Sequence, residues 1–463
     1  MSDVEYDVAI LGSGPAGYVA GIRASQLKLK ACVIEKDKPG GVCLNIGCIP
    51  SKAIIHEAEG FAALTGMEEL GVKVDRAGLD YSKVLKKSRD AADAMARGVT
   101  FLLKKNNVPL VQGTGKITAR GEITLGDGKK IRAKNILVAT GSSPKQIPGF
   151  EFDGNIVISS DGALMLSELP KRILILGGGA IGCEFAHILS AFGVEVILVE
   201  MLDHLLPLED AETVAVLERS FKKRGITVLT GTKALEMKKG KGSAAVTLEE
   251  KGGKKRTEEV DKVLVVVGRG PNTAGIGLES VGIKTDRGFI PVHDYYQTDA
   301  PGIYAAGDVT ASPLLAHVAS KESEIAVEHM AGHPTIPRID PDTIPGTVYT
   351  EPQVASFGVN EERAKREGIA YAKAIFPYRG AGKSVAIGKS EGHVKLLYDP
   401  KTHEILGAHI VGAEGTELIH ELLLAKYSEL LPEDIATMIH AHPTLSEAVM
   451  ETARTAEGWV IHV

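Results

Sequence analysis

Two stretches of sequence decide the fold: YDVAILGSGPAG at residues 6–17 and RILILGGGAIG at residues 172–182. In each, an apolar run typical of a buried strand leads into a Gly-x-Gly-x-x-Gly turn and then a helical segment. A second apolar run follows in each copy. It ends at an acid, Glu35 or Glu200, which lies 23 residues after the first glycine of the turn. This repeat predicts two dinucleotide-binding units in one chain.

The glycines of such a turn have separate physical roles. The first makes the tight turn from strand to helix, the second lets a pyrophosphate approach the backbone, and the third lets the helix pack on the strand. The terminal acid accepts hydrogen bonds from a ribose 2′-hydroxyl, and a carboxylate at Glu200 would repel a 2′-phosphate. Residues 201–204 include no arginine to receive such a phosphate, so the second unit favours NAD over NADP. The candidate glycines are Gly12, Gly14 and Gly17, and then Gly177, Gly179 and Gly182.

The rest of the chain continues the alternation of strands and helices that is typical of a parallel α/β architecture. Each unit is closed by a later strand and a glycine, Gly141 in the first and Gly268 in the second. From about residue 348 the pattern becomes β-rich and then helical. The charged segment 236–259 reads as a hairpin on the surface.

Composition limits the possible functions. The chain has 463 residues, a net charge of −6 and a globular balance of 44% hydrophobic and 24% charged residues. This mild acidity argues against nucleic acid or an anionic membrane as partner. Four cysteines are too few for a disulfide-stapled fold of this size. We expect no membrane-spanning helix, and the acidic start of the chain lacks the features of a signal peptide, so we expect the cytoplasm.

The segment GGVCLNIGCIPSK, residues 40–52, carries two of the four cysteines, Cys43 and Cys48. Gly47 relieves crowding between them, and Pro50 suits the first turn of a helix that starts near Cys48. A helix N-terminus stabilises a thiolate, which favours reversible redox use of the pair. Two unrelated buried thiols, or half of a zinc site, are the alternatives. Zinc would need two more ligands, and no second cysteine pair exists, so we expect no metal site.

The segment HAHPTLSE, residues 440–447, lies near the C-terminus. His442 could act as an acid–base group, with Glu447 fixing its tautomer and stabilising its charged form. Thr444 and Glu447 also form a capping-box pattern for the helix that follows. His440 and His442 could be a metal pair, although no further ligands are evident.

Taken together, these residues resemble the FAD-dependent pyridine nucleotide-disulfide oxidoreductases. The resemblance covers essentially the whole chain. It is carried by GSGPAG, GGVCLNIGCIPSK, ATGS, GGGAIGCE, VGRGPNT, AAGDV, LLAH and HAHPTLSEA. It implies two Rossmann-like dinucleotide-binding domains, a central domain and a C-terminal α+β dimerisation domain. The expected boundaries are 1–149 for FAD, 150–277 for NAD, 278–346 for the central part that completes the FAD site, and 347–463 for the interface.

The resemblance also implies functional residues and partners. FAD would contact Gly12, Gly14, Gly17, Glu35, Lys52, Gly141, Asp308 and Ala316. NAD would use Gly177, Gly179, Gly182, Glu200 and Gly268, and Glu184 would pair with Lys52 on the flavin side. Without the family, Lys52 and Glu184 read as an ordinary surface pair, and Asp308 as a turn residue.

The implied reaction is NAD⁺-dependent oxidation of a protein-bound dihydrolipoyl group through Cys43 and Cys48, with His442 and Glu447 supplied by the partner subunit of a homodimer. The lipoyl carrier would be the acyltransferase of a 2-oxo acid dehydrogenase complex or the lipoyl protein of glycine cleavage. The alternatives are another NAD(P)H-dependent FAD disulfide reductase and a low-turnover flavin redox sensor. Two positions depart from the family pattern: Val318 stands where lysine is frequent, and Ala180 is small where relatives often have a bulkier residue.

Overall fold

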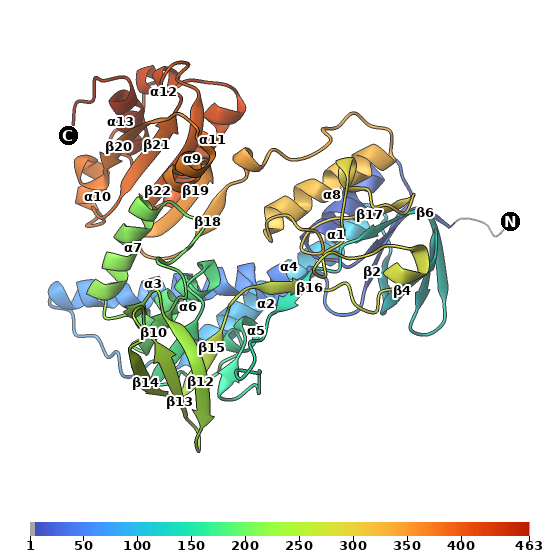
Figure 1. The fold of residues 1–463 in the computed structure, drawn as a ribbon, viewed down its shortest axis with the longest axis horizontal. Helices are drawn as coiled ribbons and strands as arrows, with labels where there is room; N and C mark the ends of the chain where they lie inside the picture. Colours follow the sequence, from blue (N-terminus) through green and yellow to red (C-terminus); the bar gives the residue numbers. More distant parts are fainter. Residues whose placement is uncertain (1–4, 463) are drawn as a thin grey trace.

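The computed structural model describes residues 5–462 and contains three main sheets with their helices (Figure 1). The first sheet has the order β3-β2-β1-β6-β5-β4, and β17 pairs with β6. Its central pairings are parallel, whereas β5 runs antiparallel to both of its neighbours, β4 and β6. The strands are β1 (Tyr6–Leu11), β2 (Ala31–Glu35), β3 (Leu110–Gln112), β4 (Gly115–Ala119), β5 (Glu122–Leu125), β6 (Lys130–Val138) and β17 (Ile303–Ala305). Because β17 comes after the whole second sheet in sequence, the chain returns to complete the first one.

The helices around the first sheet come from both ends of this split. Helix α1 (Pro15–Gln26) follows the first glycine turn and packs closely against α8 (Ala316–Met330). The others are α2 (Gly41–Ile46), α3 (Cys48–Glu69) and α4 (Tyr81–Lys105).

The second sheet is fully parallel, in the order β11-β10-β9-β15-β8. Its strands are β8 (Val157–Ile158), β9 (Arg172–Leu176), β10 (Glu195–Val199), β11 (Thr227–Leu229) and β15 (Lys262–Val265). Its helices are α5 (Ser160–Ala163), α6 (Ala180–Ala191) and α7 (Ala211–Lys223). The segment predicted as a hairpin forms three antiparallel strands instead of two: β12 (Lys233–Lys239), β13 (Ala244–Glu249) and β14 (Lys255–Val260). A two-stranded ribbon joins β7 (Ser142–Pro144) to β16 (Arg269–Pro271).

The third sheet is antiparallel, in the order β18-β19-β22-β21-β20, and it forms the upper left part of Figure 1 with its helices. Its strands are β18 (Gly346–Val348), β19 (Gln353–Gly358), β20 (Ala372–Pro377), β21 (His393–Tyr398) and β22 (Ile405–Gly412). Its helices are α9 (Glu361–Glu367), α10 (Gly382–Ala386), α11 (Gly415–Tyr427), α12 (Pro432–Thr437) and α13 (Ser446–Ala456). Short 3-10 turns cover Leu278–Val281, Asp294–Tyr296, Pro341–Thr343 and Tyr378–Gly380. These three sheets confirm the predicted fold class.

Helix α3 joins the first and second sheets. Its buried side chains Ile54, Ile55 and Ala58 belong to the same apolar cluster as Phe185 of α6 and Val214 of α7. This packing fixes the first turn of α3, with its cysteine and lysine, against the second unit. Within the described residues, no helix is long and apolar enough to cross a membrane.

A buried lysine joins the second and third sheets. Lys395 of β21 is fully buried, and its Nζ donates to both carboxylate oxygens of Asp210 at 2.9 Å and to Glu212 at 3.0 Å. It also contacts Glu361. Burial alone would raise the pKa of Asp210, but His409 and Lys395 lower it below its ordinary value. The N-terminus of α7 is therefore anchored to the third sheet by charge.

Replacing Lys395 by methionine is expected to destabilise the protein by about 3–5 kcal/mol, because it leaves the Asp210 carboxylate buried and unpaired. The control is Lys373→Met: this lysine is 41% exposed and also contacts Glu212 and Glu361, so its loss should cost less than about 1 kcal/mol. Thermal unfolding of both variants measures the difference. A group with a lowered pKa adds stability above its unfolded-state pKa and loses it as pH falls through its folded-state pKa. The gap between wild type and Lys395→Met should therefore narrow below about pH 4. Equal effects of the two substitutions would contradict this account.

Candidate active site

The three glycines of the first turn differ in how much space a side chain would have. Gly12 has a φ of +100°, and a Cβ there would meet the Ala139 carbonyl oxygen at 2.3 Å. A Cβ on Gly17 would lie 1.9 Å from the Gly12 carbonyl oxygen. Gly14 is different, since the nearest atom to its Cβ position is 3.9 Å away. The fold itself thus requires the outer two glycines, while the middle one leaves space at the N-terminus of α1.

The second glycine turn repeats this arrangement. Gly177 has a φ of +113°, and a Cβ there would meet the Val266 carbonyl oxygen at 2.5 Å. A Cβ on Gly182 would lie 1.9 Å from the Gly177 carbonyl oxygen. Nothing lies within 4 Å of a Cβ on Gly179. Backbone N–H groups and a helix N-terminus beside open space fit a pyrophosphate in both turns.

The two terminal acids lie over these turns. Glu35 Oε2 accepts hydrogen bonds from Ser13 N at 2.9 Å and Ser13 Oγ at 2.7 Å. Glu200 Oε2 accepts one from Gly178 N at 2.7 Å, and its Oε1 accepts one from Leu202 N at 2.9 Å. Both carboxylates are therefore fixed by backbone groups beside the space left by the middle glycine, which suits a ribose hydroxyl.

The closing strands place the remaining candidates. Gly141 and Gly268 follow β6 and β15 with φ values of +71° and +111°. Asp308 accepts a hydrogen bond from Ser142 Oγ, so it lies beside the β7 ribbon rather than in an isolated turn. Ala316 is the first residue of α8.

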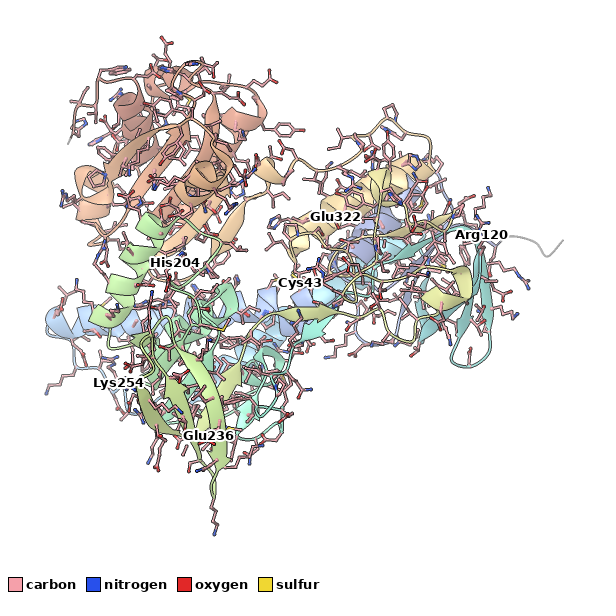
Figure 2. All side chains as sticks on the ribbon, viewed as in Figure 1. Cys43, Arg120, His204, Glu236, Lys254 and Glu322 are labelled. Carbon is pink, nitrogen blue, oxygen red and sulfur yellow. The ribbon has the colours of Figure 1, made fainter. Side chains whose placement is uncertain are left out.

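The two cysteines lie on two successive helices. Cys43 lies in the short helix α2 and Cys48 begins α3. A Cβ on Gly47 would meet the Val42 carbonyl oxygen at 2.9 Å and Cys43 Cα at 3.2 Å, so glycine permits this close approach. Both thiols are free, which is the reduced form of the predicted couple. Figure 2 shows Cys43 near the centre of the molecule.

The two thiols differ in acidity. A hydrogen bond from Cys43, aided by Lys52 and a backbone N–H, lowers the pKa of Cys48 to about 7 against the effect of burial. The same hydrogen bond, with burial, raises the pKa of Cys43. The position of Cys48 at the N-terminus of α3 and its lowered pKa both favour Cys48 as the thiolate of the reduced pair. Cys32 in β2 and Cys183 in α6 are buried, as predicted for structural cysteines.

The structure brings Lys52 and Glu184 together from α3 and α6. Lys52 Nζ lies 2.9 Å from both Glu184 carboxylate oxygens, and the Glu184 side chain is 10% exposed. The pair lies one helical turn from Cys48, whose thiolate the ammonium stabilises.

The C-terminal histidine and glutamate also meet. His442 Nδ1 lies 2.9 Å from Glu447 Oε1, while Glu447 Oε2 accepts the Thr444 N–H at 2.9 Å. Burial would raise the pKa of Glu447, but the Thr444 N–H and His442 lower it. The Glu447 carboxylate therefore makes both the contact with His442 and one of the two hydrogen bonds of the predicted capping box. The two histidines have different carboxylate partners, since His440 Nε2 lies 2.8 Å from Glu421 Oε1.

The His442 side chain is 76% exposed. No hydrogen bond or ion pair within residues 5–462 connects it to Cys43 or Cys48 of the same chain.

Sequence reasoning missed contacts that support the cysteine loop from α4. Arg89 Nη1 donates to the Asn45 carbonyl at 2.7 Å, and Ser88 Oγ donates to the Pro50 carbonyl. Tyr349, which contacts both Lys52 and Glu184, was missed as well. These partners lie far away in sequence and belong to no motif, so no pattern in the sequence indicates them.

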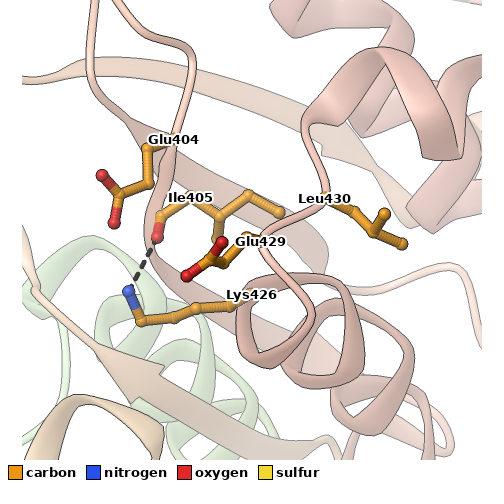
Figure 3. A pocket seen from close by; sticks show the side chains of 5 residues that line it. All are labelled: Glu404, Ile405, Lys426, Glu429 and Leu430. Carbon is orange, nitrogen blue, oxygen red and sulfur yellow. Dashed lines mark hydrogen bonds between the residues drawn. The ribbon is translucent and has the colours of Figure 1, made fainter.

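A hollow of about 830 Å³ lies elsewhere, between α8, residues 336–345 and α11. Val318, one of the two positions that depart from the family pattern, lines it. Figure 3 shows a smaller hollow beside it, where Lys426 Nζ donates to the Ile405 carbonyl at 2.9 Å. Neither hollow is lined by a cysteine or a motif glycine.

Comparison with known proteins agrees with this geometry. The family model of pyridine nucleotide-disulphide oxidoreductases matches residues 6–323, and the model of the dimerisation domain of these enzymes matches residues 344–453. The chain therefore belongs to the pyridine nucleotide-disulphide oxidoreductases. The family uses FAD and NAD(H), as the resemblance implied, so the predicted class of enzyme and its cofactors are confirmed.

Several relatives have a more specific name. The chain is 42% identical to a dihydrolipoyl dehydrogenase of Bacillus subtilis over 99% of both chains. It is 43% identical to that of Chlorobaculum tepidum, over 97% of this chain and 96% of the relative. Among solved structures, LpdA from Mycobacterium tuberculosis matches with a TM-score of 0.88 and 30% identity, over 96% of this chain and 98% of that one. The flavoprotein disulfide reductase RclA from Escherichia coli, 24% identical with a TM-score of 0.85, shares the fold.

Proposed function

We propose that this protein oxidises the dihydrolipoyl group of a lipoylated protein, with NAD⁺ as the final acceptor. The observation that carries the proposal is the placement of Cys43 in α2 and of Cys48 at the first residue of α3, with Lys52 one turn further along α3. A thiolate at a helix N-terminus next to a second thiol suits thiol–disulfide exchange. The names of the full-length relatives support the choice of substrate.

The geometry above supports the following proposal for the site residues. The FAD-binding residues would be Gly12, Gly14, Gly17, Glu35, Lys52, Gly141, Asp308 and Ala316, and the NAD-binding residues Gly177, Gly179, Gly182, Glu200 and Gly268, with Glu184 holding Lys52. The division into residues 1–149, 150–277, 278–346 and 347–463 is part of the same proposal.

The reaction of the cysteines is an exchange of one disulfide for another. Starting from the Cys43–Cys48 disulfide, His442 takes a proton from one dihydrolipoyl thiol, and the resulting thiolate attacks Cys43 Sγ. Cys48 leaves as a thiolate, which Lys52 and the start of α3 stabilise. The second dihydrolipoyl thiol then displaces Cys43, which leaves with a proton. The lipoyl group has lost two electrons, and the cysteine pair has gained them. A flavin held at the first glycine turn would supply the acceptor for this electron pair and the hydride donor for NAD⁺.

The exposed position of His442 supports a site shared between two copies of the chain. Ile439 is 96% exposed and Met438 48%, and both lie within four residues of His442 in the chain. An apolar surface of this kind beside His442 suits a second copy, and the dimerisation model covers it. In the homodimer, His442 of one chain would face Cys43 of the other.

The lipoylated partner is proposed to be an acyltransferase of a 2-oxo acid dehydrogenase complex or the lipoyl protein of glycine cleavage, and the compartment the cytoplasm. The test of the reductive half is addition of dihydrolipoamide to the FAD-containing protein without NAD⁺. A new thiolate–flavin absorption at long wavelength should appear. Its absence would favour a flavin redox sensor with little turnover.

Replacing Gly179 by valine is expected to raise the KM for NAD⁺ on the order of tenfold or more, because the side chain would fill the space left for the pyrophosphate. The backbone there is extended, with a φ of −73°, so the fold tolerates a side chain. FAD content and reduction by dihydrolipoamide should stay unchanged. Gly66→Val in α3, where a Cβ also meets nothing, is the control and should leave the KM unaltered. Steady-state kinetics measure the KM. An unchanged KM for NAD⁺ in Gly179→Val would show that NAD⁺ does not bind at this turn.

A further inference from the structure

Tyr349 connects the third sheet to the Lys52–Glu184 pair. It follows directly after β18, which lies beside α6 (Figure 1). Its backbone N–H donates to Glu184 Oε1 at 3.1 Å, and Lys52 Nζ lies 4.4 Å from the centre of its ring. One residue therefore contacts both members of the pair.

The ring does more than fill space. The Lys52 side chain is 35% exposed, so water competes with Glu184 for its ammonium. An aromatic face against the ammonium attracts the cation and excludes water from that side. The ammonium is thereby held at one position between α3 and α6.

That position matters for Cys48. The charged and titratable groups that act on its thiol are Cys43 from α2, Lys52 from α3 and Glu184 from α6. Lys52 stabilises the thiolate and Glu184 opposes it, so their net effect depends on where the ammonium stands relative to the sulfur.

We propose that Tyr349 is a positioning residue that holds the Lys52 ammonium at the redox pair, so that the segment after the first strand of the third sheet tunes the charge environment of Cys48. The inference rests on the proposed function in taking Cys48 as the thiolate that faces FAD.

The test compares Tyr349→Leu with Tyr349→Phe, which keeps the ring. The first readout is the midpoint pH of the thiolate–flavin absorption after reduction by a dithiol. The second is the midpoint pH for alkylation of Cys48 by iodoacetamide in a Cys43→Ser background, which needs no flavin signal. Each Tyr349 substitution is compared with its own background. Loss of the ring gives the ammonium more water and more freedom, so Tyr349→Leu should raise both midpoints by about half a pH unit or more. Tyr349→Phe should leave them unchanged.

A double-mutant cycle separates positioning from general disturbance. Lys52→Met should raise the midpoints at least as far as Tyr349→Leu, and adding Tyr349→Leu to Lys52→Met should cause little further shift, because the two residues act through one charge. Tyr349→Met is the substitute if the leucine variant fails to fold.

Unshifted midpoints in Tyr349→Leu, an equal shift in Tyr349→Phe, or additive shifts in the double variant would overturn the inference. These outcomes differ from failure of the proposed function, which would show in the wild-type protein as absence of the thiolate–flavin absorption. The alkylation profile would still test Tyr349 in that case.

Discussion

Replacement of either Cys43 or Cys48 by serine is expected to lower the turnover of dihydrolipoamide by on the order of 10³-fold or more, with FAD still bound. Serine keeps the volume of the side chain but cannot exchange a disulfide. Steady-state NADH formation measures the loss. Cys32→Ala is the matched control, since Cys32 is buried in β2, and it should retain turnover.

The two serine variants should also differ from each other. Cys43→Ser leaves a free Cys48 thiol, so the thiolate–flavin absorption should be present without any dithiol. Cys48→Ser should lack it, because the substitution removes the thiol at the start of α3 that is proposed to face FAD. Identical spectra, or full turnover in either variant, would show that the pair is not the redox couple.

His442→Ala is expected to cause the second-largest loss, on the order of 10²- to 10⁴-fold in turnover, because a positioned acid–base group contributes that much. Glu447→Gln should cost less, since the imidazole remains and loses only the carboxylate on Nδ1. His333→Ala, at an exposed loop histidine, is the control. Turnover of His442→Ala at the wild-type rate would exclude it as the base.

The His442→Ala variant also tests whether the active site is shared between two subunits. Mixing inactive Cys43→Ser and His442→Ala proteins and allowing their subunits to exchange should restore activity. The heterodimer contains one site in which Cys43 of one chain meets His442 of the other. No rescue despite confirmed exchange would place both residues in the same chain's site.

The glycine turns could be predicted from sequence because each glycine has a local cause. Gly12 and Gly177 need a positive φ, and Gly17 and Gly182 leave no room for a Cβ, so the spacing alone carries the information. The cysteine segment is local as well: Gly47 and the start of α3 at Cys48 follow from neighbours in the chain.

Other parts of the site depend on contacts that leave no local pattern. The sequence pattern of Thr444 and Glu447 fits a cap as well as a catalytic dyad, and only the geometry shows that one carboxylate makes both contacts. Tyr349 reaches Glu184 across 165 positions, and Arg89 reaches Asn45 across 44. The two residues of each pair lie far apart in the sequence. Packing of the sheets and helices brings them together, and no periodicity in the sequence indicates this.

The most direct test of the central claim is NADH formation by the purified, FAD-containing protein given dihydrolipoamide and NAD⁺, beside the same protein given glutathione disulfide and NADPH. The account predicts rapid NADH formation in the first mixture and little NADPH consumption in the second. Turnover of glutathione disulfide with NADPH, and none of dihydrolipoamide with NAD⁺, would contradict it.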